Sequence, residues 1–278
     1  MSAPLLFTLA LLPPLCAGAW VQVWGDEFTA PTINASLWNV YSNVPEGRPP
    51  SWNQIELYTA DNVFLDRGAL VLRTRPQNVT FGGVAYNVTS GRVDTALKAN
   101  VTFGRVEVSA QLQNDAAYGL HTAHWLLGYD CWPRGGEIDL MECQSPHNAY
   151  AGGGGGDWQV ATSNFHIGPS CGKETRHSTG TSAWPRAPTP GLNYSAGFTQ
   201  FAVEWNATDL VYFVGGARVN HVWAGMPGWA APFAIPSWPM YLILSQAYMA
   251  RRPYGDPAPW LWPVEQRIDY VRVFSWEA

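Results

Sequence analysis

Charge is scarce in this sequence. Only 13% of the 278 residues are Asp, Glu, Lys or Arg, the formal net charge is −5, and no run of five or more basic residues occurs. Nucleic-acid binding depends on basic patches, so it has little electrostatic support here. The hydrophobic content of 47% also argues against a disordered chain, because it suffices for a large core.

Cysteine is nearly as scarce. The chain has four, and Cys16 lies in an N-terminal apolar segment, which leaves Cys131, Cys143 and Cys171. No C-x-x-C pair occurs, so the spacing is not that of a zinc site. Three cysteines allow one disulfide and one free thiol, and the spacing does not decide which two pair.

Long hydrophobic runs are also missing. The apolar run over residues 5–15 is too short to span a bilayer, and no other stretch looks transmembrane. An A-x-A cleavage motif ends at Ala19. Although no Lys or Arg precedes the run, we expect residues 1–19 to be a cleaved signal peptide rather than an anchor, followed by one folded domain over residues 20–278. We therefore expect a secreted protein, extracellular or in a cell wall.

N-x-S/T sequons support secretion, because they are acceptors for N-glycosylation at the surface of secreted proteins. None has proline at the middle position, and they begin at Asn34, Asn78, Asn87, Asn100, Asn193 and Asn206. We therefore expect a glycoprotein.

Aromatic residues are present in excess, with 15 Trp, 12 Tyr and 11 Phe. Most of them fit a β-rich core. Some Trp side chains would instead suit sugar binding, because a pyranose has an apolar face that stacks on an exposed indole.

Strand-like segments recur from the first third of the chain to its end. They are rich in β-branched and aromatic residues, and apolar and polar side chains mostly alternate along them. They cover residues 69–75, 103–113, 199–219, 240–249 and 267–276. No long stretch has helical periodicity. Since no linker separates the segments, we predict one all-β domain, a sandwich of two antiparallel sheets.

Three loop segments have unusual composition. Residues 151–158 read AGGGGGDW, and residues 181–193 and 224–239 are rich in Pro and Trp. We expect the first to be a flexible glycine tract. We expect the other two to be ordered loops that rim a cleft, with surface decoration as the equal alternative.

The segment RGGEIDLMEC, residues 134–143, holds three acids within six positions. On a strand Glu137 and Asp139 share a face, while simple alternation puts Glu142 on the opposite one. A β-bulge at Leu140-Met141 would reset the alternation and bring all three acids to one face. The backbones of Glu137 and Glu142 would then lie about 13 Å apart. Converging side chains could narrow this gap to the ~5–5.5 Å of a retaining glycosidase pair.

Two other interpretations of the acids stay open. A strand can carry acids on a solvated face without function, and three acids after a Gly-Gly pair could bind calcium. The flanking aromatic residues Trp125 and Trp132 favour a glycosidase, in which they would contact sugar.

The sequence closely resembles glycoside hydrolase family 16, especially its laminarinase-like members. WPRGGEIDLME, residues 132–142, is similar to the family signature WPxxGEIDxME. Other segments resemble the family in the same order, namely WGDEFTAPTINASLW, WNQIELYTADNVFLDRGALVL, TSGRVDT, FAVEWNATDLVYFVGG and IDYVRVF. The resemblance covers most of the chain after the leader.

This resemblance implies a β-jelly-roll sandwich with a substrate cleft on its concave face. It also implies that Glu137 is the nucleophile, Glu142 the acid/base and Asp139 an assisting acid. The extra residue Met141 matches the bulged branch of the family.

The resemblance extends to binding residues. No cofactor is implied for catalysis, but many members hold a structural calcium ion, for which Gly68 and Asp269 fall at ligand positions. Residues that match sugar-binding positions are Asn53, Arg92, Trp132 and His166. One segment departs from the family: GLHTAHW, residues 119–125, has His121 and His124 where aromatic residues are common. We expect this change to alter the polarity of the cleft and the sugars accepted.

The expected function is that of a secreted retaining endo-β-glucanase, which hydrolyses β-1,3 or mixed β-1,3/1,4 glucan by double displacement. The alternatives are a cell-wall glucan transglycosylase and a non-catalytic β-glucan-recognition protein, and the presence of both glutamates disfavours the second. The expected partner is the polysaccharide alone, with no nucleic acid, no membrane after signal cleavage, and a monomeric state. We also expect negative charge on Glu137 and Asp139 to raise the pKa of Glu142 and keep it protonated near neutral pH.

Overall fold

The computed structural model describes residues 18–43, 54–113, 119–144, 161–174, 194–226, 234–249 and 262–278. Most of the expected leader, the Gly-rich segment and the Pro- and Trp-rich loop at 181–193 lie outside these residues. Asn53 and part of the loop at 224–239 lie outside them too. The roles expected of these segments therefore stay predictions.

The described chain folds into two β-sheets, with one short 3₁₀ turn (η3, Ala60–Asn62). No helix in these ranges is long and apolar enough to cross a membrane. The strands are β1 (Ala19–Asp26), β2 (Asn39–Val40), β3 (Leu57–Tyr58), β4 (Val63–Asp66), β5 (Ala69–Phe81), β6 (Val84–Ser90), β7 (Arg92–Asp94), β8 (Gly104–Gln111), β9 (Leu120–Gly128), β10 (Glu137–Gln144), β11 (Ala161–His166), β12 (Thr199–Trp205), β13 (Asp209–Val214), β14 (Ala217–Trp223), β15 (Met240–Tyr248) and β16 (Val264–Glu277).

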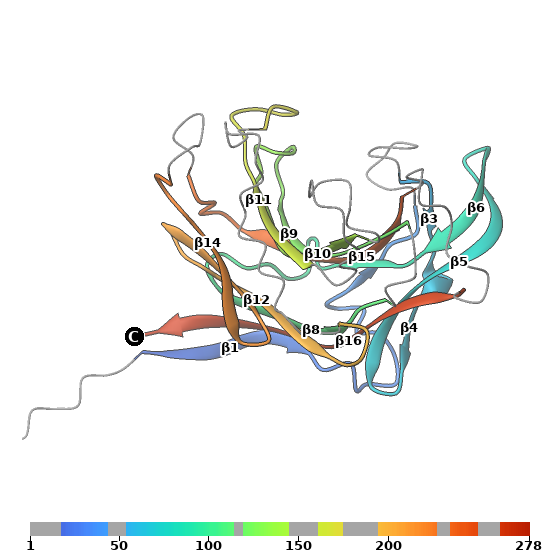
Figure 1. Ribbon diagram of the computed structural model, residues 1–278, viewed down its shortest axis with the longest axis horizontal. Helices are drawn as coiled ribbons and strands as arrows, with labels where there is room; N and C mark the ends of the chain where they lie inside the picture. The colour runs from blue at the N-terminus through green and yellow to red at the C-terminus, as the bar shows by residue number, and fades with distance from the viewer. Residues whose placement is uncertain are drawn as a thin grey trace, which may run out of the picture.

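The two sheets form separate layers. The larger has the order β14-β13-β12-β8-β16-β5-β6-β3, with β1 paired to β16 and β4 to β5, and the smaller has the order β11-β10-β9-β15-β7-β2. Figure 1 shows β9, β10 and β15 in one layer above β8, β12 and β16, with β6 and β11 rising on either side. The prediction of a two-sheet all-β sandwich is confirmed, and every predicted strand segment overlaps an observed strand.

The core lies between the layers and follows the alternation of the strands. Val108 and Phe201 of the larger sheet, and Leu126 and Leu140 of the smaller one, are fully buried in one hydrophobic cluster. Each strand of the smaller sheet therefore turns one set of side chains into the core and the other set onto the outer face of that sheet. That outer face carries the three acids.

Candidate active site

The bulge expected in β10 is present. Asp139 pairs with Trp125 of β9, but the next pair is Met141 with His124, so β10 has one extra residue there. The pairing with β11 shifts over the same stretch. Leu140 and Met141 are consecutive and both fully buried in the core. The alternation thus resets, and Glu137, Asp139 and Glu142 all point away from the core.

Glu137 begins β10 and is held by the loop before it. The indole Nε1 of Trp132 donates a hydrogen bond to Oε2 of Glu137. This loop is tied to the chain after β11 by a disulfide between Cys131 and Cys171, while Cys143 is buried and takes no part in a disulfide. The pairing that the sequence left open is therefore decided by proximity, with a Cα–Cα distance of 5.3 Å.

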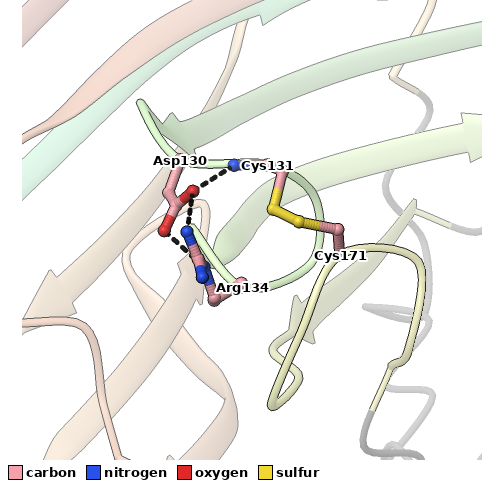
Figure 2. Close-up of a disulfide and its surroundings, with 4 residues drawn as sticks. All are labelled: Asp130, Cys131, Arg134 and Cys171. Atoms are coloured by element: carbon pink, nitrogen blue, oxygen red, sulfur yellow. Dashed lines mark hydrogen bonds and ion pairs between the residues drawn. A yellow bond between two sulfur atoms is a disulfide. The ribbon is translucent and has the colours of Figure 1, made fainter.

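Figure 2 shows how the same loop is closed on its exposed side. Asp130 accepts hydrogen bonds from the Arg134 guanidinium at 2.6 and 2.7 Å and from the Cys131 amide at 2.7 Å. Because both charged side chains are about half exposed, the pair contributes little to stability. It nevertheless shapes the turn that carries Trp132.

Asp139 is the most buried of the three acids, with an exposed fraction of 1%. Nε2 of His166, on β11, lies 3.2 Å from Oδ2 of Asp139, and the other ring nitrogen lies 2.5 Å from Oε1 of Glu174. Burial lowers the pKa of His166, but the two carboxyl partners outweigh it and raise this pKa well above its ordinary value. A positive imidazole therefore stands beside Asp139.

Glu142 is held by two strands. Nε2 of His121, on β9, lies 2.8 Å from Oε1 of Glu142, and the Asn164 amide on β11 donates to Oε2. Both oxygens of the carboxyl are thus engaged, and its orientation is fixed before any substrate binds.

Burial and mutual repulsion set the protonation of the acids. Burial, and after it the charge of Asp139, raises the pKa of Glu137 well above its ordinary range. Burial and the charge of Glu142 raise the pKa of Asp139 to about 6. Burial also raises the pKa of Glu142, but its hydrogen bonds and the nearby positive charge of His121 outweigh burial and lower this pKa. The expected raised pKa at Glu142 is therefore wrong, because a histidine contacts this carboxyl.

Two of the expected sugar-binding residues lie together on the same sheet. Arg92, on β7, is 4% exposed, and its guanidinium lies 4.6 Å from the ring centre of Tyr41 and 5.5 Å from that of Trp125. The Trp125 indole donates to the Ser245 hydroxyl at 3.2 Å. These contacts form a stacked group beside the acids, since Trp125 pairs with Asp139 across the sheet.

In the described part of the chain, one group of acids and histidine is close enough to hold a metal ion. Glu137, Asp139 and His166 each offer one donor atom within 4.8 Å of the others, but the Trp132 indole and Glu174 already bind two of these side chains. We assign no ion there.

The expected calcium position lies on the larger sheet. Gly68 has a positive φ of 74° in the turn between β4 and β5, and the Asp269 carboxyl accepts from Ser109 at 3.4 Å. Calcium takes six to eight oxygens, of which these two residues supply a backbone carbonyl and a carboxylate. Calcium binding here stays a prediction.

The comparisons with known proteins agree with this geometry. A family model described as Glycosyl hydrolases family 16 matches residues 53–271. The chain belongs to family 16. Relatives include the clotting factor G alpha subunit of Tachypleus tridentatus, 27% identical over 92% of this chain and 34% of its own length. A glucan endo-1,3-beta-glucosidase A1 of Niallia circulans is 26% identical, over 91% of this chain and 37% of its own length. The chain thus spans about a third of these two proteins.

Solved family 16 structures share the fold. The catalytic domain of an endo-1,3-beta-glucanase from Thermotoga petrophila has a TM-score of 0.74 at 25% identity, covering 94% of this chain and all of that one. The laminarinase catalytic domain of Thermotoga maritima has a TM-score of 0.70 at 26% identity, covering 92% of this chain and 98% of that one. The expected jelly-roll sandwich is thereby confirmed.

Within this family 16 site, sequence reasoning missed several polar residues. Glu174 and Asn164 were not predicted, and Glu56, fully buried near His121, was not either. A signal existed for Asn164, because Thr162, Asn164 and His166 alternate with buried residues on β11. Glu174 and Glu56 lie outside the strands that carry the acids, so no periodicity links them to the site.

Proposed function

We propose that the chain is a secreted endo-β-glucanase that cuts β-1,3 or mixed β-1,3/1,4 glucan with retention of configuration. The observation that carries the proposal is the bulge in β10, which turns Glu137, Asp139 and Glu142 to one face. Two carboxyls on one face suit double displacement. The glucanases among the relatives support glucan as the substrate.

In the first step Glu137 acts as nucleophile. Its carboxylate attacks the anomeric carbon while Glu142 gives a proton to the departing glycosidic oxygen, and a covalent glycosyl-enzyme forms. Asp139 assists, because it hydrogen-bonds Glu137 and can take up the proton that the two carboxyls share as Glu137 attacks. The Trp132 indole orients the attacking carboxylate.

In the second step Glu142 acts as base. It takes a proton from a water molecule, which attacks the same carbon and releases Glu137. Two inversions give net retention. Sugar binding is proposed for Arg92, Trp125, Trp132 and His166, which lie beside the acids, and also for Asn53, which lies outside the described residues. No cofactor takes part.

Secretion and a monomeric state are part of the proposal. The disulfide between Cys131 and Cys171 supports an oxidising compartment. The asparagines of five sequons are exposed, as N-glycosylation requires, at Asn34, Asn78, Asn87, Asn100 and Asn206. Glycosidase treatment of the secreted protein would show a loss of mass if these sites carry glycans.

The test is incubation with laminarin, lichenan, agarose, carrageenan and xyloglucan, with products sized by chromatography and the first product followed by proton NMR. We expect intermediate oligosaccharides from laminarin or lichenan, formed first as the β-anomer. An initial α-anomer would contradict the two-carboxylate mechanism. Products longer than the substrate would indicate the transglycosylase, and binding without cleavage would indicate the recognition protein.

A further inference from the structure

His121 is the histidine that β9 turns toward the acids. Its Nε2 lies 2.8 Å from Oε1 of Glu142, and the two side chains are only 15% and 19% exposed. Asn164 donates to the second oxygen of the same carboxyl. The imidazole is therefore in direct contact with the group assigned as acid/base, in a place that little water reaches.

Three carboxyls act on His121 among the described residues. Glu142 and Asp139 face it from β10, and Glu56 faces it from the segment before β3. On the other side of β9, β15 places Ala247 opposite His121 and adds no charge. Among the described residues, a neutral aromatic ring at this position would leave the Asn164 amide as the one side-chain donor to the Glu142 carboxyl.

The proton of this pair is strongly held. Burial lowers the pKa of His121, but the hydrogen bond to Glu142 and the surrounding negative charges outweigh burial and raise this pKa above its ordinary value. The pKa of Glu142 is lowered by the same contact. Both shifts favour the form in which the imidazole carries the proton and Glu142 is ionised, although an acid catalyst must begin protonated.

We propose that His121 is a positioning residue that shares one proton with Glu142, so that the pair, rather than the carboxyl alone, stores the proton given to the leaving sugar. This inference rests on the proposed function, in which Glu142 is the acid/base.

The proton balance closes without any further reactant. When substrate displaces water, the neutral pair is favoured over the ion pair, and the proton moves from Nε2 of His121 to Glu142. Glu142 releases a proton to the glycosidic oxygen as the C–O bond breaks, which leaves a neutral imidazole and a carboxylate. The water that attacks the glycosyl-enzyme gives its proton to Glu142, and the pair is reloaded.

The test compares His121→Gln with the wild type and with Glu142→Gln. Glutamine keeps a hydrogen-bond donor beside Glu142 but cannot carry the proton. For hydrolysis of a β-1,3-gluco-oligosaccharide, we expect the basic limb of the kcat/KM profile to move to lower pH by about one unit in His121→Gln. With a dinitrophenyl β-laminarioligosaccharide, whose leaving group needs no proton, we expect both variants to form the glycosyl-enzyme at nearly the wild-type rate.

The matched control is His221→Gln. His221 makes a similar contact, 2.6 Å from Asp209, but on the larger sheet, so its loss should leave the pH profile unchanged. The inference is overturned if His121→Gln keeps the wild-type basic limb, or if it slows both substrates equally, as a purely structural role would require. His121→Phe gives a second variant that removes the proton and the donor together, and it should show a larger loss on the oligosaccharide. If the wild type cleaves no glucan, the proposed function fails instead.

Discussion

Two histidines of β9 lie three residues apart and face opposite sides of the smaller sheet. His121 contacts Glu142 on the outer face. His124 is fully buried, 3.0 Å from Oε1 of Gln266, and packs edge-on against Phe201. Only one of the two can therefore alter the site, and the expectation that both change the polarity of the cleft is wrong for His124. Residues three apart on a strand without a bulge point to opposite faces, and the pairing of β9 with β15 is regular over this stretch.

The burial of His124 predicts how the stability of the protein changes with pH. Burial lowers its pKa to about 4, whereas an unfolded chain binds this proton near its ordinary pKa of about 6.5. The neutral imidazole thus contributes on the order of 3 kcal/mol to the free energy of unfolding above pH ~6.5. This contribution is lost as the pH falls toward 4. We expect His124→Phe to show a shallower fall of the free energy of unfolding between pH 7 and pH 4.5, measured with urea.

The variant also leaves Oε1 of Gln266 without its His124 contact. That cost should be the same at each pH. The experiment therefore compares how the free energy of unfolding changes with pH in the two proteins, and not its absolute value. Other groups that titrate in this range, such as Asp139 and His166, are common to both proteins and cancel in the difference. Equal slopes would mean that folding does not lower the pKa of His124.

At the scale of the element, β10 is the strand on which the site depends. Its inward side chains are Ile138, Leu140, Met141 and Cys143, all within the core. Leu140 and Met141 are consecutive and mark the bulge. The other positions from the start of the strand to Glu142 are the three acids. A shift of one residue in this strand would exchange the acids with core side chains.

The prediction for this element is an insertion. One Ala between Glu137 and Ile138 should abolish glucan cleavage while the protein stays folded, because Glu137 then lies on the wrong face relative to Asp139 and Glu142. Activity is measured on laminarin, and folding by far-ultraviolet circular dichroism.

A matched insertion tests whether added length alone matters. Gly215 and Gly216 form the exposed turn between β13 and β14, and an Ala between them should leave activity nearly intact. A folded and active insertion at Glu137 would show that the common face of the acids is not required.

At the scale of the whole molecule, one covalent link joins the two loops that flank the acids. The disulfide between Cys131 and Cys171 closes a segment of 40 residues that contains β10 and β11. It therefore holds the loop that carries Trp132 against the chain that follows His166. The ring centres of Trp132 and His166 lie 6.1 Å apart.

Removing this link should lower stability. For a loop of 40 residues, the loss of chain entropy in the unfolded state predicts about 4 kcal/mol. We expect the free energy of unfolding, measured with urea, to be lower by that amount in the double variant Cys131→Ser with Cys171→Ser. A reductant should destabilise the wild type but not the double variant. The control is Cys143→Ala, which has no disulfide to lose and should respond to reductant as the wild type does.

The sequence by itself determined the strands and the sandwich, and it predicted a common face for Glu137, Asp139 and Glu142 on the condition that the strand has a bulge. Each follows from alternation or from a short motif, and these are local properties of neighbouring residues. Even the bulge was predictable, because three acids with the spacing of this segment can share a face only if one residue is extra.

Only the tertiary structure decided which cysteines pair, which histidine reaches Glu142, and which way the pKa of that carboxyl moves. These depend on contacts between residues far apart in the chain, such as Glu56, His121 and Glu142. A pKa responds to every charge and to the burial around a group. The sequence sets the order of these charged groups along the chain, but only folding sets the distances between them.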